Sequence, residues 1–128
     1  MSTTLYLVDD EPLVTRVLMR SLSKRGFTVT TFHDGHDVLD AIAANPPQVL
    51  ITDIEMPLMS GRELCETIAA QYPDRSWPIF IVTSAPDLVH REWSSQLPDV
   101  HFVEKPVSIA QLCLALEQRL AAGQEASS

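Results

Sequence analysis

The sequence predicts an α/β protein in which a parallel sheet lies between two layers of helices, and three observations favour this fold class. Apolar runs of strand length alternate with helix-like segments five times along the chain. The runs are nearly continuously apolar, as is typical of parallel strands that are buried on both faces. Four of them end on carboxylate, hydroxyl or ammonium side chains, and ligands of open α/β sheets bind beyond the carboxyl ends of the strands.

The first two pairs of strand and helix follow from apolar spacing and turn residues. Residues 5–8 are apolar and predict the first strand. Pro12 is tolerated in the first turn of a helix, and apolar residues at helical spacing continue until Gly26 supplies a stop. Residues 27–32 are rich in β-branched and aromatic side chains, which predicts the second strand. The helix that follows ends at the Asn-Pro-Pro segment of residues 45–47.

The middle of the chain contains the third and fourth strands. The third strand, at residues 49–52, leads directly into Asp53. Ser60 and Glu63 form a capping-box pattern, which predicts the start of the third helix. The fourth strand covers residues 79–82 and runs into two hydroxyl side chains.

The C-terminal part completes the alternation. A helix is expected at about residues 87–96, and a fifth strand at residues 100–104 runs into a lysine. Ser108 and Gln111 form a second capping box in front of a final helix with an apolar stripe. We expect one folded domain, residues 1–122, followed by a flexible tail, residues 123–128.

Some polar side chains are interpreted as ordinary solvated surface. Glu117 and Arg119 of the last helix are assigned to an exposed face. His33 and His36 have a spacing seen in metal sites, but no cysteine or carboxylate pattern completes a closed zinc site. We therefore expect surface histidines.

Composition limits the class of protein. A chain of 128 residues with 45% hydrophobic residues can bury a core as one domain. The net charge of −8, from nine Lys and Arg against 17 Asp and Glu, argues against direct contact with nucleic acid or with an anionic membrane. Cys65 and Cys113 have no metal or redox spacing and are interpreted as reduced thiols. No targeting or membrane-spanning segment is recognisable, so we expect a cytoplasmic protein.

Three carboxylates are expected to meet at one edge of the sheet. Asp9, Asp10 and Asp53 converge if the first and third strands are neighbours, which the flavodoxin-like (βα)5 order 2-1-3-4-5 provides. The fold is then a three-layer α/β/α sandwich. Two unit charges about 4 Å apart repel by about 4 kcal/mol at an effective dielectric constant near 20. A cation must offset this repulsion, and a few oxygen ligands with room for water suit Mg²⁺.

The same edge carries the groups that phosphoryl transfer requires. An aspartate can attack a phosphoryl group and form a covalent aspartyl phosphate, and the protein then has to position the group and neutralise its oxygens. Lys105 supplies a compact positive charge on a flexible stem. Thr83 or Ser84 can donate a hydroxyl group to another oxygen.

Four segments along the chain carry the polar residues of this edge: residues 7–12 (LVDDEP), 53–61 (DIEMPLMSG), 81–85 (IVTSA) and 102–106 (FVEKP). In this order they resemble the receiver domain of bacterial two-component response regulators. The resemblance covers about residues 4–120, nearly the whole chain.

The resemblance implies a role for each residue of the site. It implies that Asp53 is the phosphoacceptor and that Mg²⁺ is held by Asp53, by Asp10 directly, by Asp9 through water and by the backbone carbonyl of Glu55. The remaining residues that it assigns are Thr83 as the switch hydroxyl, Phe102 as the aromatic that turns inward behind it, Lys105, and a cis Pro106.

The resemblance also implies how such a chain works. It would take a phosphoryl group from the phosphohistidine of a sensor histidine kinase or a histidine phosphotransfer protein, as one step of a phosphorelay. It would then change the face formed by its fourth helix, fifth strand and fifth helix, which would act on an unidentified protein target or form a phosphorylation-dependent homodimer. Such a domain turns over no separate substrate and is not an enzyme in that sense.

Two other functions remain open from the residues. A Mg²⁺-dependent phosphohydrolase of the haloacid-dehalogenase type also uses an aspartate nucleophile. That type has Asp-x-Asp after its first strand, whereas here adjacent acids follow the first strand and the expected nucleophile follows the third. A phosphorylation-independent binding module is disfavoured by the intact set of reactive residues.

Overall fold

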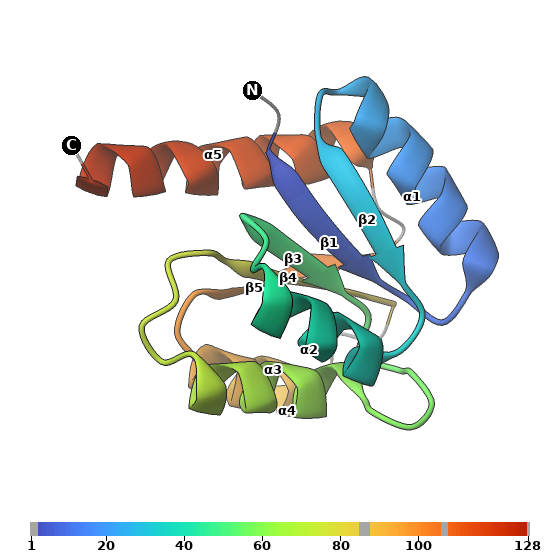
Figure 1. Cartoon of the computed structure of the whole chain (residues 1–128), viewed down its shortest axis with the longest axis vertical. Coiled ribbons are helices and arrows are strands. Elements are labelled where there is room, and N and C mark those ends of the chain that lie inside the picture. Colours follow the sequence, from blue (N-terminus) through green and yellow to red (C-terminus); the bar gives the residue numbers. More distant parts are fainter. Residues whose placement is uncertain (1–2, 85–87, 106–107, 128) are drawn as a thin grey trace.

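The computed structural model describes residues 3–84, 88–105 and 108–127. Strands and helices alternate along the whole chain (Figure 1). The strands are β1 (Thr4–Val8), β2 (Thr28–Phe32), β3 (Val49–Thr52), β4 (Ile79–Thr83) and β5 (Val100–Glu104). The helices are α1 (Pro12–Lys24), α2 (Gly35–Ala44), α3 (Gly61–Gln71), α4 (Leu88–Ser95) and α5 (Ile109–Ser127).

The sheet has the strand order β2-β1-β3-β4-β5, and all neighbouring strands are parallel. Helices α1 and α5 cover one face, and α2, α3 and α4 cover the other (Figure 1). The predicted three-layer sandwich and its strand order are therefore confirmed. The order reverses between β1 and β3, which is where ligands bind in doubly wound sheets.

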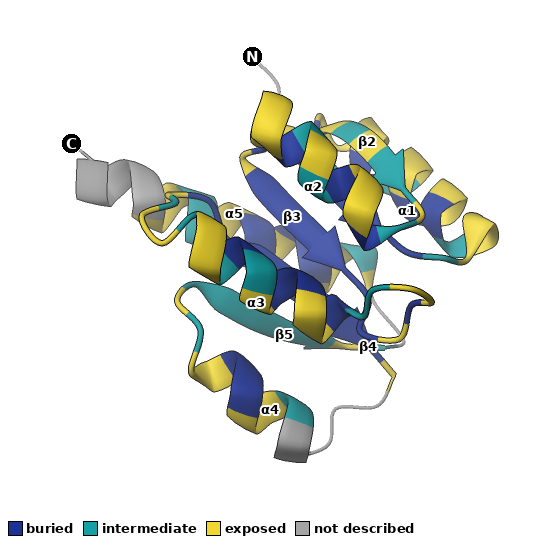
Figure 2. Ribbon diagram, turned by 60° about the horizontal axis from the view of Figure 1, so that its bottom comes forward, coloured by how far each residue is buried: buried dark blue, intermediate teal, exposed yellow. Residues whose placement is uncertain are grey.

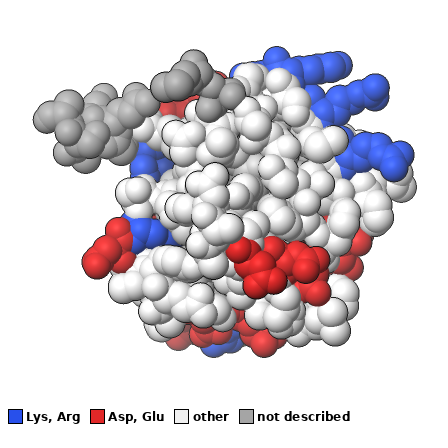
Figure 3. Space-filling view, in the orientation of Figure 1, with Lys and Arg blue, Asp and Glu red and all other residues white. Residues whose placement is uncertain are grey.

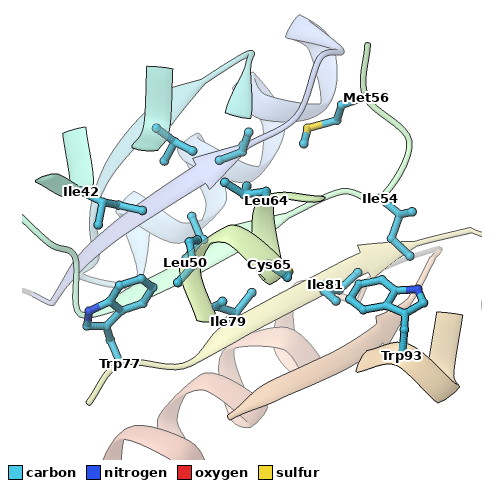
Figure 4. Packing of buried hydrophobic residues seen from close by; sticks show 13 residues of the cluster. Ile42, Leu50, Ile54, Met56, Leu64, Cys65, Trp77, Ile79, Ile81 and Trp93 are labelled. Carbon is cyan, nitrogen blue, oxygen red and sulfur yellow. The ribbon is translucent and has the colours of Figure 1, made fainter. Parts of the chain in front are cut away.

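The central strands are completely buried, as their apolar sequences predict. Every residue of β3 and β4 is buried (Figure 2). On the face covered by α2, α3 and α4, Leu50 and Ile79 pack beneath Leu64 of α3 (Figure 4). A second cluster on the other face contains Leu112 and Leu116 of α5. The two clusters hold the central strands from both sides, which fixes the position of their carboxyl ends.

The cysteines belong to these two cores. Both Cys65 and Cys113 are buried and free. Burial raises the pKa of the Cys65 thiol to about 12, because a thiolate would lose its hydration in the apolar core. Cys65 therefore remains a neutral, packed side chain at physiological pH.

Local capping interactions set the helix boundaries near the sheet edge. The side chain of Ser60 accepts a hydrogen bond from the backbone N–H of Glu63 at 3.1 Å, and the Glu63 carboxylate accepts one from the backbone N–H of Ser60 at 3.3 Å. The predicted capping box of α3 is thus confirmed. Asp34 caps α2 by accepting from the backbone N–H of His36 at 2.7 Å. These caps satisfy N–H groups that have no partner within the helix.

The last helix, α5, ends at residue 127, and the flexible tail expected at residues 123–128 stays a prediction. Helical backbone continues through residue 127, because Ala, Gln and Glu residues in this segment favour a helix. Among the described residues, no helix has both the length and the apolar character needed to cross a lipid bilayer.

Surface charge is unevenly distributed. Lys and Arg side chains project along α1, whereas Asp and Glu side chains gather over α2 (Figure 3). Arg16, Arg20 and Lys24 of α1 are exposed, and the sequence of this helix contains no acid. The surface of α1 is therefore basic, although the chain as a whole has a net charge of −8.

Arg119 is not a solvated side chain, contrary to the expectation from the sequence. Its Nε donates to Oδ1 of Asp99 at 2.8 Å, its terminal nitrogen contacts Oδ2 of the same carboxylate, and it donates to the carbonyl of Ser76 at 3.1 Å. His101 also lies 2.7 Å from the Asp99 carboxylate. Burial alone would raise the pKa of Asp99, but the bonds from Arg119 and His101 outweigh it and hold that pKa below its ordinary value.

We expect Arg119→Leu to lower the free energy of unfolding by about 2 kcal/mol at pH 7, because it leaves the Asp99 carboxylate without its bidentate partner. A depressed carboxylate pKa contributes stability above the unfolded-state value, about 4, and this contribution is lost at lower pH. Urea titrations should therefore show a difference from wild type that shrinks below about pH 4. Arg16→Leu, at an exposed position, is the control. A pH-independent difference, or an equal loss in the control, would contradict the assignment.

We also expect Gly61→Ala to be strongly destabilising, by about 3 kcal/mol. A Cβ atom at Gly61 would lie 2.0 Å from the backbone oxygen of Asp53 and 2.8 Å from the Cα atom of Ile54, so the backbone would have to move. Gly26→Ala is the matched control, since its φ is +98° but no atom lies within 4 Å of the added carbon. It should cost about 1 kcal/mol through backbone strain alone. Chemical denaturation of both variants tests whether Gly61→Ala loses more stability than Gly26→Ala.

Candidate functional site

Backbone hydrogen bonds extend the sheet just beyond the strand ends and bring Asp9 and Asp53 together. Val8 of β1 pairs with Thr52 of β3, so the two acids follow paired residues. The backbone N–H of Asp53 donates to the Val8 carbonyl at 3.2 Å, and that of Asp9 donates to the carbonyl of Phe32 in β2 at 3.1 Å. Because parallel strands in register present equivalent positions on the same face, the two carboxylates start from neighbouring points of one edge.

Asp10 completes a cluster of three acids. Carboxylate oxygens from Asp9, Asp10 and Asp53 all lie within 4.8 Å of one another. Asp9 is 3% exposed and Asp53 is 9% exposed, whereas Asp10 is half-buried. The expected convergence of these three residues is therefore present in the fold, and two of them are largely removed from water.

Lys105 reaches the same cluster from β5. Its backbone N–H donates to the Thr83 carbonyl at 2.8 Å, which continues the pairing of β4 and β5 by one step. Its ammonium nitrogen lies 3.5 Å from Oδ2 of Asp53 and 3.8 Å from Oδ2 of Asp9. One lysine thus partly neutralises two carboxylates of the cluster.

The carboxylate oxygens of Asp9 and Asp53 that do not face Lys105 accept hydrogen bonds from the backbone. Oδ1 of Asp53 accepts from the backbone N–H of Ile54 at 2.7 Å, which leaves Oδ2 directed at the lysine. Oδ1 of Asp9 accepts from the backbone N–H of Glu11 at 2.9 Å. These bonds fix the orientation of both carboxylates without using the oxygens that face Lys105.

The electrostatic balance of the cluster is unfavourable to charge on Asp9. Burial raises the pKa of Asp9 above its ordinary value. The hydrogen bond from the backbone N–H of Glu11 lowers this pKa, whereas the negative charge of Asp53 raises it further. The positive charge of Lys105 also lowers the pKa of Asp9, and the negative charge of Asp10 raises it. Among the described residues, the Lys105 ammonium group lies beside Asp9 and Asp53, and Asp10 adds a third negative charge, so a further cation at this position would lower the repulsion. The cluster offers only oxygen atoms as ligands and is partly open to water, and Mg²⁺ prefers such sites. The residues present therefore fit a magnesium ion.

The other residues assigned by the resemblance lie at or near the same edge. Glu55 is exposed in the loop after Asp53, and its assignment as a carbonyl ligand stays a prediction. Thr83 is buried at the end of β4, and Ser84 is exposed. Pro106, expected in cis, lies outside the described residues.

Thr83 and Phe102 lie on the same face of the sheet. Phe102 pairs with Ile81, two positions before Thr83 on β4, and side chains two positions apart on a strand point to the same side. Phe102 is half-buried against the core beneath α4. The guanidinium carbon of Arg91, on α4, lies 5.8 Å from the centre of the Phe102 ring. The ring therefore links β5 to α4.

Sequence reasoning missed one side chain at the site. His33 is exposed, as expected, but its Nδ1 lies 3.0 Å from the backbone oxygen of Asp9. Its place directly after β2, next to the residue that pairs with Val8, is the signal that could have identified it.

Comparison with known sequences identifies a family and several relatives of this chain. A model of the response regulator receiver domain family matches residues 5–117. The chain is 34% identical over 120 residues to the DNA-binding transcriptional regulator NtrC of Escherichia coli, covering 94% of this chain and 25% of that protein. It is 32% identical over 112 residues to the response regulator MprA of Mycobacterium tuberculosis, covering 88% of this chain and 48% of that protein. The chain thus spans a quarter to a half of these relatives.

Solved structures agree with the sheet topology. A signal receiver domain of an HD domain-containing protein from Pseudomonas fluorescens superposes with a TM-score of 0.87 at 25% identity, covering 98% of this chain and 99% of that one. A CheY-like receiver domain protein from Methanospirillum hungatei superposes with a TM-score of 0.89 over 98% of both chains, and at 21% identity this likeness concerns the fold alone. On the family match across residues 5–117, this chain belongs to the response regulator receiver domain family.

Proposed function

We propose that Asp53 accepts a phosphoryl group from a phosphohistidine in a Mg²⁺-dependent reaction, and that the face formed by α4, β5 and α5 responds. The observation that carries this proposal is the geometry at Asp53. One of its carboxylate oxygens is held by the Ile54 N–H at 2.7 Å, and the other lies 3.5 Å from the ammonium group of Lys105. The carboxylate is therefore oriented and only 9% exposed, as a nucleophile at a protected site requires.

The chain's own residues supply attack and charge neutralisation. An oxygen of Asp53 forms the new O–P bond while the P–N bond of the phosphohistidine breaks, and the electron pair of that bond stays on the departing imidazole nitrogen. Lys105 and the hydroxyl group of Thr83 would stabilise negative charge on the phosphoryl oxygens. Bound Mg²⁺, held by Asp10, Asp53 and the Glu55 carbonyl and through water by Asp9, would supply further neutralisation.

The response would pass through Thr83 and Phe102. The phosphoryl group adds charge and strong acceptor oxygens at the end of β3, next to β4. Movement of the Thr83 side chain toward these oxygens would open space on the face that it shares with Phe102. The ring could then turn inward and leave Arg91 of α4, which lies over it at 5.8 Å. Two arrangements of one packed pair are the general form of such a switch.

The proposed partners follow from this role. The donor would be a sensor histidine kinase or a histidine phosphotransfer protein in the cytoplasm, and the output would be contact with a protein target or with a second copy of this chain. The receiver unit would comprise residues 1–122. We propose no direct contact of this chain with nucleic acid, and no turnover of a separate substrate.

The acceptor assignment predicts that Asp53→Asn abolishes labelling by phosphoramidate in the presence of Mg²⁺, because the amide is a far weaker nucleophile. Intact-mass spectrometry should detect one added phosphoryl group in the wild type and in Asp74→Asn, a control at an exposed acid. Labelling of the Asp53 variant would refute the assignment. Multiple turnovers of a generic phosphate ester by the wild type would instead favour a phosphohydrolase.

The metal assignment predicts that Mg²⁺ raises the melting temperature of the wild type, since an ion that binds only the folded state at 100 times its Kd adds about 2.7 kcal/mol. Asp9→Asn should respond less to Mg²⁺. Without metal, the same variant should be more stable than the wild type by about 1 kcal/mol, or roughly 3–6 °C, because a buried and repelled charge is removed. Thermal melts with and without MgCl₂ test both effects, with Asp74→Asn as control. An unchanged wild-type melt would count against the site.

A further inference from the structure

Beyond the last backbone hydrogen bond between β1 and β2, the side chain of His33 adds one more contact between the two chain segments. Residues of the two strands pair up to Val8 and Phe32, and the backbone N–H of Asp9 donates to the Phe32 carbonyl at 3.1 Å. Strand β2 ends there. The next group of Asp9, its backbone carbonyl, is met by Nδ1 of His33 at 3.0 Å.

The chemistry of this contact defines the donor. A carbonyl oxygen can only accept a hydrogen bond, so Nδ1 of His33 carries the proton. This holds for one neutral tautomer and for the imidazolium ion, so the contact does not depend on the charge of the ring. The residue itself is exposed, whereas Asp9 is 3% exposed. The bond therefore reaches from the surface to the backbone of a buried acid.

The carbonyl that His33 contacts belongs to the peptide bond between Asp9 and Asp10. A peptide unit is planar, so a hydrogen bond to its oxygen restricts rotation of the whole plane. The Asp9 N–H bond to Phe32 restrains the preceding peptide unit in the same way. The two bonds together restrain both peptide units that flank the Cα atom of Asp9, and so the direction of its side chain, and they restrain one of the two peptide units that flank Asp10.

The loop that carries His33 is itself anchored. Asp34 accepts hydrogen bonds from the backbone of His36 at 2.7 Å and from its ring at 3.0 Å. A Cβ atom added to Gly35 would lie 2.7 Å from the sulfur of Met59, so this loop packs closely against the loop that follows Asp53. These contacts restrain the backbone on the C-terminal side of His33, and the bond to the Asp9 carbonyl restrains its ring.

We propose that His33 is a positioning residue for the divalent cation: its Nδ1–H bond to the Asp9 carbonyl orients the peptide that joins Asp9 to Asp10 and thereby raises the affinity of the cluster for Mg²⁺. This inference rests on the proposed Mg²⁺ site but adds a residue that contacts neither the ion nor the phosphoryl group. Partners that orient metal ligands contribute to metal affinity although they do not touch the metal.

The test compares three substitutions in the full chain. His33→Phe keeps a planar ring but removes the donor. His33→Asn places an amide N–H close to the position of Nδ1 and should restore the bond. His36→Phe is the matched control, because it removes a second exposed histidine, in the first turn of α2, whose ring contacts Asp34. Isothermal titration with MgCl₂ gives the Kd of each metal-free protein, and phosphoramidate labelling gives its rate against Mg²⁺ concentration.

We expect the Kd for Mg²⁺ to rise about five-fold in His33→Phe, as expected for the loss of one hydrogen bond, and to stay within about two-fold of wild type in His33→Asn and His36→Phe. At saturating Mg²⁺ the labelling rate of His33→Phe should return toward wild type, which a general loss of structure would not allow. An unchanged Kd in His33→Phe, or a Kd in His33→Asn as weak as in His33→Phe, would overturn the proposal. Wild-type protein that binds no Mg²⁺ would instead overturn the proposed function.

Discussion

The close approach of three carboxylates to one another, with the Lys105 ammonium group beside two of them, is the constraint on which the rest of this molecule depends. Mutual repulsion would drive Asp9, Asp10 and Asp53 apart if they were carried by mobile loops. They are held within 4.8 Å because they follow two paired strands in register, β1 and β3, whose last residues are buried. Packing in the two cores offsets the repulsion between the carboxylates. The acids therefore stay close enough together to bind a cation.

The sequence was sufficient to predict the sheet and the acid cluster. The alternation of apolar runs and helices predicts a parallel, doubly wound sheet, and the acids lie directly after those runs, so their convergence depends only on which strands are neighbours. The capping box of Ser60 and Glu63 was equally predictable, because both partners lie within one helical turn. Interactions of this kind are local or follow from topology.

Contacts that depend on the path of a single side chain were not predictable. Arg119 is separated from Asp99 by 20 residues, and His33 from Asp9 by 24. Neither pair has a spacing that distinguishes it from ordinary surface residues.

The bidentate link between Arg119 and Asp99 determines how α5 can move. It ties α5 to the loop just before β5, and the bond from Arg119 to the Ser76 carbonyl adds the segment before β4. This attachment lies at the end of the sheet opposite to Lys105. A helix fastened at one point can tilt about that point but cannot slide along the sheet. Small displacements near Lys105 would therefore become angular changes of α5, with Asp99 as the pivot.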